Sequence, residues 1–315
     1  PLLEPLELKE PVRLQSLIQF LKQPAQHFFN QRLEVRFRGS EELVSDDEPF
    51  TINGLEQYQL MDELVLSETS PEATLNRLRL EGRLPLGSPG AVFLETLGKK
   101  IQSIRHWEMT LLETLDDPLE TPLELPSLRI PIGASEPLII EDWLYDLRPI
   151  TANPGHYAAL EYRPTRLFKK GTRTTALIPL WVRQLAANAA GIEVSSHLIG
   201  EDGILSLPVL SKATALEALE ALVRAFRLGT TAPLPVAPET ACAYLKSKSK
   251  GLNDAQKAFE GTWVFPGEQD RSLYLRRAFP SFDDLIQTKV GDQDFKSLSV
   301  ALYQGLIDHS IERTE

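Results

Sequence analysis

Apolar positions follow a helical spacing in the first part of this chain. Leu14, Leu17, Ile18 and Leu21 recur at i, i+3, i+4 and i+7, which predicts one apolar helix face. Pro24 ends this helix or begins the next one, because proline lacks an N–H and has a fixed φ. The same periodicity predicts further helices over residues 55–66, 72–80 and 91–115.

The pattern changes after residue 137. Apolar runs over residues 138–147 and 157–162 flank a turn at Asn153-Pro154-Gly155, which predicts a pair of strands. Residues 175–190 are apolar on nearly all sides and predict a buried helix. A hairpin is expected over residues 192–209, turning at Glu201-Asp202-Gly203. An amphipathic helix is expected over residues 216–228.

The change of pattern falls in a Pro- and Glu-rich segment over residues 116–126. We therefore predict a mainly helical part over residues 1–125 and an α/β part of the α+β class over residues 126–315, together forming one domain. The Pro-rich segments 2–11 and 117–131 have little periodicity, so we expect them to provide apolar surface for a partner.

Charge is unevenly spread along the 315 residues. The net charge is -11, from 44 acids and 33 Lys or Arg. Residues 161–315 hold 18 of the acids and 19 of the cations, which leaves 26 acids and 14 cations before them. The overall charge argues against a general nucleic-acid binder. A partner that needs positive charge would meet the second half.

Other compositional features exclude several classes of protein. No apolar run reaches the roughly 18 residues that a membrane span needs, and no signal peptide is visible. Cys242 is the single cysteine, which excludes an intrachain disulfide and an all-cysteine metal site and fits a reducing cytosol. Five scattered histidines lack metal-ligand spacing. The chain begins with Pro, so we expect it to be a piece of a longer one.

The strand, turn, strand and helix after residue 137 have the layout of a metal-dependent nuclease core. Such cores place an acid at the end of one strand and D/E-x-K on the next. Here the second strand carries Glu161-Tyr162-Arg163, which is E-x-R where the chemistry requires E-x-K.

These residues predict a degenerate site without metal. Mg²⁺ at such sites needs about two carboxylates together with substrate phosphate oxygens. An arginine cannot replace a lysine that serves as a compact charge near the attacking water. We therefore expect Glu161 to form an ion pair with Arg163 or another cation.

A basic segment follows the second strand, and no acid occurs between Glu161 and Glu193. It is either a solvated loop or a contact for DNA phosphates. A second pattern, in which Trp263, Tyr274 and Phe279 lie near Arg271, Arg276 and Arg277, fits base stacking or core packing. The candidate DNA-binding residues of the basic segment are Arg163, Arg166, Lys169, Lys170 and Arg173.

Short motifs run in order along nearly the whole chain, and their collinearity is more specific than any one of them. They are Leu17-x-x-Phe20-x-x-x-Pro24-x-x-x-Phe28-Phe29-x-x-Arg32-Leu33-x-Val35, Glu48-Pro49-Phe50-Thr51-x-x-Gly54-Leu55-x-x-Tyr58-Gln59, Gly82-x-Leu84-Pro85-x-Gly87, Tyr162-Arg163-Pro164, Phe226-Arg227-x-Gly229-x-x-x-Pro233-Leu234 and Phe259-Glu260-Gly261. With these motifs the chain resembles the RecC C-terminal domain family, part of the gamma chain of exodeoxyribonuclease V (RecBCD).

The resemblance implies a restriction-endonuclease-like (PD-(D/E)XK) fold whose active site is lost, with Tyr145, Glu161 and Arg163 as its remnant. Active relatives carry an Asp at the position of Tyr145. Asp142 and Asp146 are an odd number of residues from Tyr145, so on a continuous strand they would face away. It implies no catalysis by this chain alone, no cofactor and no metal. It also implies a cytoplasmic complex with RecB-like and RecD-like subunits that binds DNA ends and separates their strands in double-strand-break repair. Some active relatives carry an iron–sulfur cluster on four cysteines, which one thiol cannot supply.

Two alternatives stay open at this point. One is a catalytically active PD-(D/E)XK nuclease, and the other is an assembly module that never contacts DNA. Cleavage and metal-binding assays would separate the first from a non-catalytic domain, and binding to forked DNA would separate the second.

Overall fold

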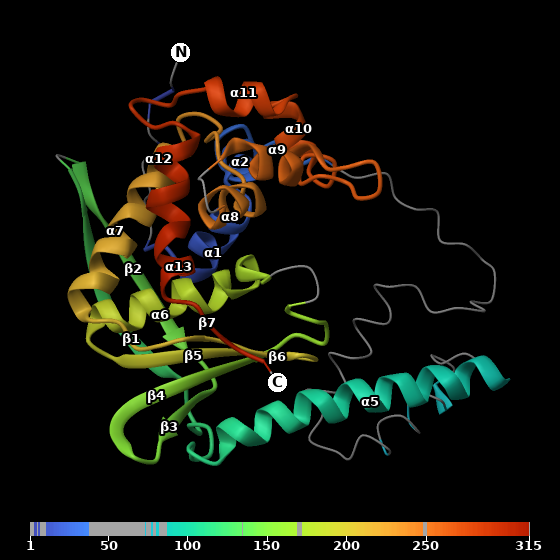
Figure 1. The fold of residues 1–315 in the computed structure, drawn as a ribbon. Coiled ribbons are helices and arrows are strands. Elements are labelled where there is room, and N and C mark those ends of the chain that lie inside the picture. Colours follow the sequence, from blue (N-terminus) through green and yellow to red (C-terminus); the bar gives the residue numbers. More distant parts are fainter. Residues whose placement is uncertain are drawn as a thin grey trace.

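The structure is a computed structural model that describes residues 3–4, 6, 11–37, 73, 77, 80–81, 87–133, 135–168, 172–247 and 251–314. The predicted helix over residues 55–66 and most of the one over residues 72–80 lie outside the described residues. Helices and strands are labelled as in Figure 1.

Helices dominate both ends of the described chain, and seven strands lie between and after them. The helices are α1 (Leu14–Lys22), α2 (Pro24–His27), α5 (Gly87–Leu112), α6 (Ile178–Ala190), α7 (Lys212–Leu228), α8 (Pro238–Lys246), α9 (Leu252–Glu260), α10 (Leu273–Ala278), α11 (Phe282–Gln287), α12 (Phe295–Ser299) and α13 (Gly305–Asp308). Shorter helical turns are η1 (Phe28–Arg32), η2 (Thr174–Leu177) and η3 (Val300–Gln304). The strands are β1 (Leu123–Ile132), β2 (Ser135–Leu144), β3 (Leu147–Ile150), β4 (Asn153–Tyr162), β5 (Glu193–Gly200), β6 (Gly203–Leu207) and β7 (Ile311–Arg313).

The described helices agree with the periodicity of the sequence. The helical face predicted from Leu14 is buried in α1, and Pro24 stands at the first position of α2. The helix predicted over residues 91–115 is α5. The buried helix predicted over residues 175–190 begins as η2 and continues as α6, which ends at Gly191 with φ +88°. A left-handed glycine of this kind is a common helix end.

The larger sheet has five strands in the order β3-β4-β5-β6-β7. Strands β4 and β5 are parallel and are joined through α6, while the other neighbours are antiparallel. Successive side chains on β4 point to opposite faces. Glu161 contacts Arg183 of α6, and the hydroxyl of the next residue, Tyr162, donates to Glu108 of α5 over 2.6 Å. Helices α6 and α5 therefore cover opposite faces of this sheet (Figure 1).

The predicted strand pair is divided differently from the expectation. The apolar run over residues 138–147 is not one strand, because the chain leaves β2 at Leu144 and begins β3 at Leu147. Strand β2 pairs with β1 in a separate two-stranded sheet, and β3 pairs with β4. The turn lies at residues 151–152, so the predicted turn residues Asn153-Pro154-Gly155 already belong to β4.

The segment predicted to be surface for a partner over residues 117–131 contains β1. Its Leu125 and Ile130 are buried, with exposures of 2% and 0%. The segment thus forms a strand with part of its apolar surface buried, and its role as a surface for a partner stays a prediction. Segment 2–11 lies largely outside the described residues.

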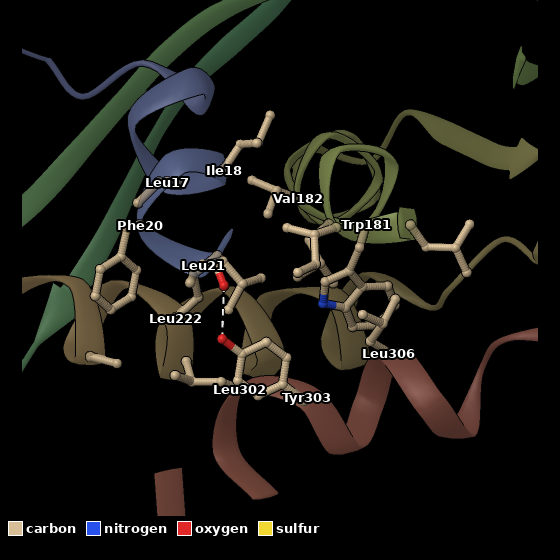
Figure 2. Packing of buried hydrophobic residues seen from close by; sticks show 14 of the residues in the cluster. Leu17, Ile18, Phe20, Leu21, Trp181, Val182, Leu222, Leu302, Tyr303 and Leu306 are labelled. Atoms are coloured by element: carbon tan, nitrogen blue, oxygen red, sulfur yellow. Dashed lines mark hydrogen bonds between the residues drawn. The ribbon is translucent and has the colours of Figure 1, made fainter. Parts of the chain in front are cut away.

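One hydrophobic cluster joins the first helix to the last ones. Ile18 of α1 lies beside Val182 of α6, and Leu17, Leu21 and Trp181 belong to the same cluster (Figure 2). The buried Tyr303 hydroxyl of η3 donates to the carbonyl oxygen of Leu21 over 2.7 Å. Because protein interiors are densely packed, this cluster holds α1 and α6 in a defined relation.

The mixed α/β class is confirmed by two sheets packed with helices. The restriction-endonuclease-like arrangement of the core stays a prediction, as does the boundary between residues 125 and 126.

Candidate functional site

The predicted nuclease remnant lies where β4 approaches α6. Glu161 stands next to the last residue of β4, and its carboxylate forms an ion pair with Arg183 of α6. Tyr145 lies in the link between β2 and β3 with 61% of its surface exposed. Arg163 follows β4, and its backbone N–H still donates to Ile199 of β5 over 2.8 Å. The predicted ion pair of Glu161 is therefore present, with Arg183 rather than Arg163 as its partner.

A pocket of about 260 Å³ opens beside this ion pair. Its apolar wall includes Leu144, Leu147, Leu180 and Val194, and its polar lining includes the buried Gln184. The Gln184 amide nitrogen donates to the Pro208 carbonyl over 2.6 Å, whereas Oε1 is buried without a hydrogen-bond partner among the described residues. The further lining residues are Tyr145, Asp146, Ala159, Leu160, Glu161, Arg183, Ala187 and Ser196.

Asp146 lies in the same pocket as Glu161, although the sequence predicted that its side chain would face away from the site. The alternation of strand residues does not extend to it, because Tyr145 and Asp146 lie between two strands and Asp146 has φ +55°. This left-handed backbone is tolerated by aspartate better than by most residues. Asp146 consequently lines the same pocket as Glu161. Asp142 instead caps α1, where its carboxylate accepts from the Leu14 N–H over 2.8 Å.

Two further cations surround Glu161. Lys22, the last residue of α1, is exposed at the surface, and the pKa of its ammonium is lowered mainly by partial loss of hydration. The nearby Glu161 opposes this shift, whereas Arg163 and Arg183 add to it. Lys22 and the Arg163 side chain have no hydrogen bond or ion pair with any residue that the structure describes, and Arg163 Nε is buried. Sequence reasoning missed Lys22 and Arg183 because they are distant from β4 along the chain.

The basic segment after β4 is anchored to the protein at its first half. Leu167 is fully buried, and its N–H donates to the Asp202 carboxylate over 2.6 Å. Glu201 lies 4.0 Å from Arg166 and 3.0 Å from Lys100 of α5, measured between charged side-chain atoms. The sequence shows no acid in this segment, but the fold brings Glu201 to it from the β5–β6 turn. Arg173 is exposed, and Lys169 and Lys170 lie outside the described residues.

A larger hollow of about 1030 Å³ lies between α5 and the basic segment. Lys99, Lys100 and His106 line it from α5, and Arg166 and Phe168 line it from the segment. Glu201 and Asp202 line it as well, and Glu201 pairs with both Lys100 and Arg166, so the hollow presents both cations and acids.

The largest exposed apolar side chains that follow one another in sequence lie in the loop after α9. Trp263, Val264 and Phe265 have exposures of 102%, 69% and 52%. We term residues 261–267 the apolar loop. Reciprocal backbone hydrogen bonds join Thr262 and Phe265, and the close approach of Gly261 to Gly267 would leave a Cβ at Gly261 only 2.4 Å from the Gly267 nitrogen.

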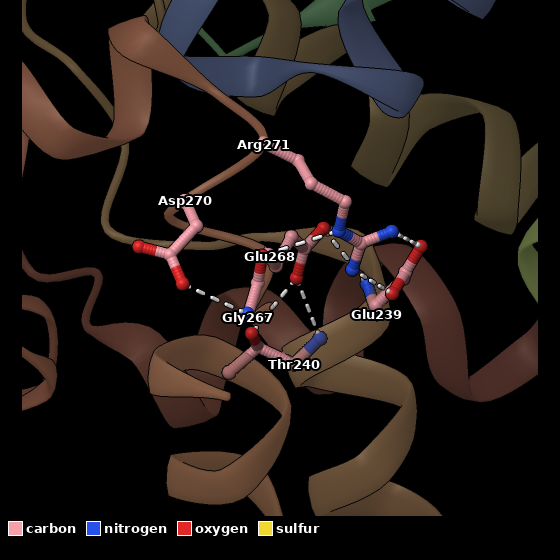
Figure 3. Close-up of polar contacts among 6 residues, drawn as sticks. All are labelled: Glu239, Thr240, Gly267, Glu268, Asp270 and Arg271. Atoms are coloured by element: carbon pink, nitrogen blue, oxygen red, sulfur yellow. Dashed lines mark hydrogen bonds and ion pairs between the residues drawn. The ribbon is translucent and has the colours of Figure 1, made fainter. Parts of the chain in front are cut away.

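Polar contacts fix the base of the apolar loop to α8. The Asp270 carboxylate accepts from the Gly267 N–H over 3.1 Å, and Arg271 pairs with Glu239. The Glu268 carboxylate accepts from the N–H groups of Glu239 and Thr240 at the start of α8 (Figure 3). Burial raises the pKa of Glu268 to about 7, although these hydrogen bonds favour the charged form.

The other predicted aromatic and arginine residues do not gather at one surface. Phe279 is buried in the core, and Tyr274 packs near Phe29 and Phe37, as expected for core packing.

Burial raises the pKa of the Cys242 thiol to about 12, which makes it a poor nucleophile. Among the described residues no group of three or more His, Cys, Asp or Glu side chains could hold a metal ion. No described helix is both long and apolar enough to span a membrane.

Comparisons with known proteins agree with the motifs in the sequence. A family model described as the RecC C-terminal domain matches residues 9–249. The RecBCD enzyme subunit RecC of Escherichia coli is 29% identical over 291 residues, which cover 86% of this chain and 24% of that protein. The RecC subunit of Haemophilus influenzae is 35% identical over 95 residues, covering 30% of this chain and 8% of that protein. The chain thus spans about a quarter of the E. coli relative's length.

Proposed function

We propose, on the premise that this chain belongs to the RecC C-terminal domain family, that it is a non-catalytic, DNA-contacting part of a RecC-like subunit. In this proposal it works in the cytoplasm with RecB-like and RecD-like subunits, and those partners carry out ATP hydrolysis and cleavage. It supports the binding of DNA ends and the separation of their strands in double-strand-break repair.

The observation that carries the non-catalytic proposal is the ion pair between Glu161 and Arg183. A carboxylate that neutralises a guanidinium is a poor ligand for Mg²⁺, which requires about two carboxylates in such sites. Lys22 and Arg163 add two more positive charges around the same carboxylate. Cations repel a divalent metal, and the site therefore favours anions.

The active-nuclease alternative is favoured by one observation, which is that Asp146 and Glu161 line the same pocket. Two carboxylates could bind a metal if Arg183 moved away. Calorimetric titration of Mg²⁺ and Mn²⁺ into the wild-type chain separates the two functions. We expect no heat from the pocket, and no difference in Asp146→Asn or Glu161→Ala. Micromolar binding lost in both variants, together with cleavage of DNA, would establish the nuclease instead.

Contact with DNA is supported by the cations of the basic segment and by the hollow between this segment and α5. Such contacts go to phosphates and are therefore independent of sequence and sensitive to salt. Glu201 partly neutralises Arg166, so Arg173 and the predicted Lys169 and Lys170 are the stronger candidates.

The test uses the complex assembled with its partner subunits and a forked DNA. Changing Arg166, Lys169, Lys170 and Arg173 to Ala is expected to weaken binding equally for different sequences and to reduce the salt slope by roughly one unit per lost contact. The matched control changes the exposed Lys212 of α7 to Ala. An unchanged slope in an intact complex would support the assembly module without DNA contact.

A further inference from the structure

Three cations from three separate elements lie near the carboxylate of Glu161. Arg183 of α6 pairs with it, while Lys22 of α1 and Arg163 after β4 have no hydrogen bond or ion pair within the described part of the chain. Asp146 lines the same pocket as Glu161 and Arg183, so the three cations exceed the two carboxylates by one positive charge.

The fold gives these side chains a common location. Glu161 and Arg163 are two residues apart on an extended chain, so they project toward the same face of the sheet. Helix α6 covers that face and contributes Arg183. The hydrophobic contacts of Leu17, Ile18 and Leu21 with α6 hold α1 in place, and Lys22 is the residue after Leu21 (Figure 2).

This arrangement has an energetic cost in the absence of an anion. The buried Nε of Arg163 lacks a hydrogen-bond partner among the described residues, and the like charges of Lys22, Arg163 and Arg183 repel one another. On the other side of Lys22 a small pocket is bordered by Glu239 and Glu268. Glu239 is paired with Arg271, and Glu268 accepts hydrogen bonds from the start of α8, so neither carboxylate compensates Lys22 directly.

A phosphate group matches the cluster better than a metal or a neutral ligand. Its oxygens accept from a guanidinium fork and from an ammonium at the same time. We propose that Lys22, Arg163 and Arg183 together bind one backbone phosphate of a DNA strand, in the place where a nuclease would hold its metal. This inference rests on the proposed DNA contact, and it adds a site outside the basic segment by assigning Lys22 and Arg183.

Glu161 competes with the phosphate for Arg183 in this arrangement. Removal of its charge would free the guanidinium and leave all three cations available. A phosphate site therefore predicts tighter binding when Glu161 is neutralised, whereas a metal site or a purely structural ion pair predicts weaker binding or none.

The experiment measures fluorescence anisotropy of a labelled single-stranded oligothymidylate with the whole 315-residue chain over a range of salt concentrations. Lys22→Gln and Arg163→Gln are each expected to reduce the salt slope by about 0.7 units and to weaken binding roughly tenfold at low salt. Glu161→Gln is expected to tighten binding several-fold. Lys212→Gln, which removes an equal charge at an exposed position of α7, is the control.

Circular dichroism and the thermal midpoint establish that each variant is folded. The inference is overturned if Lys22→Gln and Arg163→Gln behave like the control or if Glu161→Gln weakens binding. If the wild-type chain binds the oligonucleotide and the cluster variants bind it equally well, the inference fails, but the proposed contact of the basic segment is unaffected. No oligonucleotide binding by the wild-type chain overturns the assignment to DNA, and a cluster-dependent rise of the thermal midpoint in inorganic phosphate would then identify a site for free anions.

Discussion

At the scale of single residues, His197 is a neutral side chain held between two hydroxyl groups. Its Nδ1 lies 2.8 Å from the Ser206 Oγ and its Nε2 lies 3.3 Å from the Ser195 Oγ. A neutral imidazole has one donor and one acceptor nitrogen and suits this position, whereas an imidazolium has two donors. Burial lowers the pKa of His197 from 6.5 to about 4. It is therefore part of the structure of the sheet rather than a candidate acid or base.

This placement predicts how stability depends on pH. Because the folded-state pKa of about 4 lies below 6.5, the unfolded chain binds more protons between these values. The contribution of His197 is complete above pH 6.5 and is lost as the pH falls toward 4, with an upper limit of about 3 kcal/mol. We expect His197→Gln to have a flatter pH dependence of the free energy of unfolding, measured with urea. The exposed His106→Gln should retain the wild-type dependence, and an equal slope in both variants would contradict the prediction.

At the scale of elements, the basic segment depends on a close contact with the end of β5. A Cβ at Gly200 would lie 2.5 Å from the Leu167 side chain and 2.9 Å from the Thr165 carbonyl oxygen. No side chain fits there unless the segment moves. Gly200 thus allows the segment to fold back onto the sheet, where Asp202 caps it.

We expect Gly200→Ala to lower the free energy of unfolding by roughly 1–3 kcal/mol, because overpacking displaces the buried Leu167. The control is Gly98→Ala in α5, where nothing lies within 4 Å of the added Cβ. That change should be neutral or should stabilise by up to about 1 kcal/mol, since alanine favours helix. Chemical denaturation checks both values. If the two variants were equally stable, the close contact would not be a constraint on the segment.

At the scale of the whole molecule, the exposed apolar side chains of the apolar loop are not accounted for by packing within this chain. Three consecutive large apolar side chains are exposed at Trp263, Val264 and Phe265, while Gly261, Asp270 and Arg271 hold the base of the loop. Large exposed apolar groups held in one conformation are typical of contact surfaces. Under the proposed function, we expect this loop to provide surface for the rest of the assembly.

We expect the triple change of Trp263, Val264 and Phe265 to Ser to reduce co-purification with the RecB-like and RecD-like subunits at least tenfold, because a central aromatic residue commonly contributes more than about 1.4 kcal/mol to an interface. The matched control changes Val300, which is 47% exposed on η3, to Ser. Thermal unfolding of the isolated chain should be nearly unchanged in both. Normal complex formation by the triple variant would place the interface elsewhere.

Local sequence patterns determined much of the secondary structure and the family. Helical spacing predicted α1, α5, α6 and α7, and the Asp202-Gly203 turn predicted the β5–β6 hairpin. These signals are local, because a helix face or a tight turn is specified by residues within a few positions of one another. The motif order also indicated the RecC family, which the match over residues 9–249 confirms.

Tertiary structure alone decided which charges meet. The sequence predicted that Glu161 would be neutralised, but Arg183 lies 22 residues away from it and Lys22 lies on another helix. The sequence also contains no acid within the basic segment, whereas the fold brings Glu201 of the β5–β6 turn close to Arg166. The break at Tyr145–Asp146 changed the face of Asp146, because strand alternation applies only while the backbone remains extended. Electrostatic contacts depend on distance in space, and chain separation does not specify that distance.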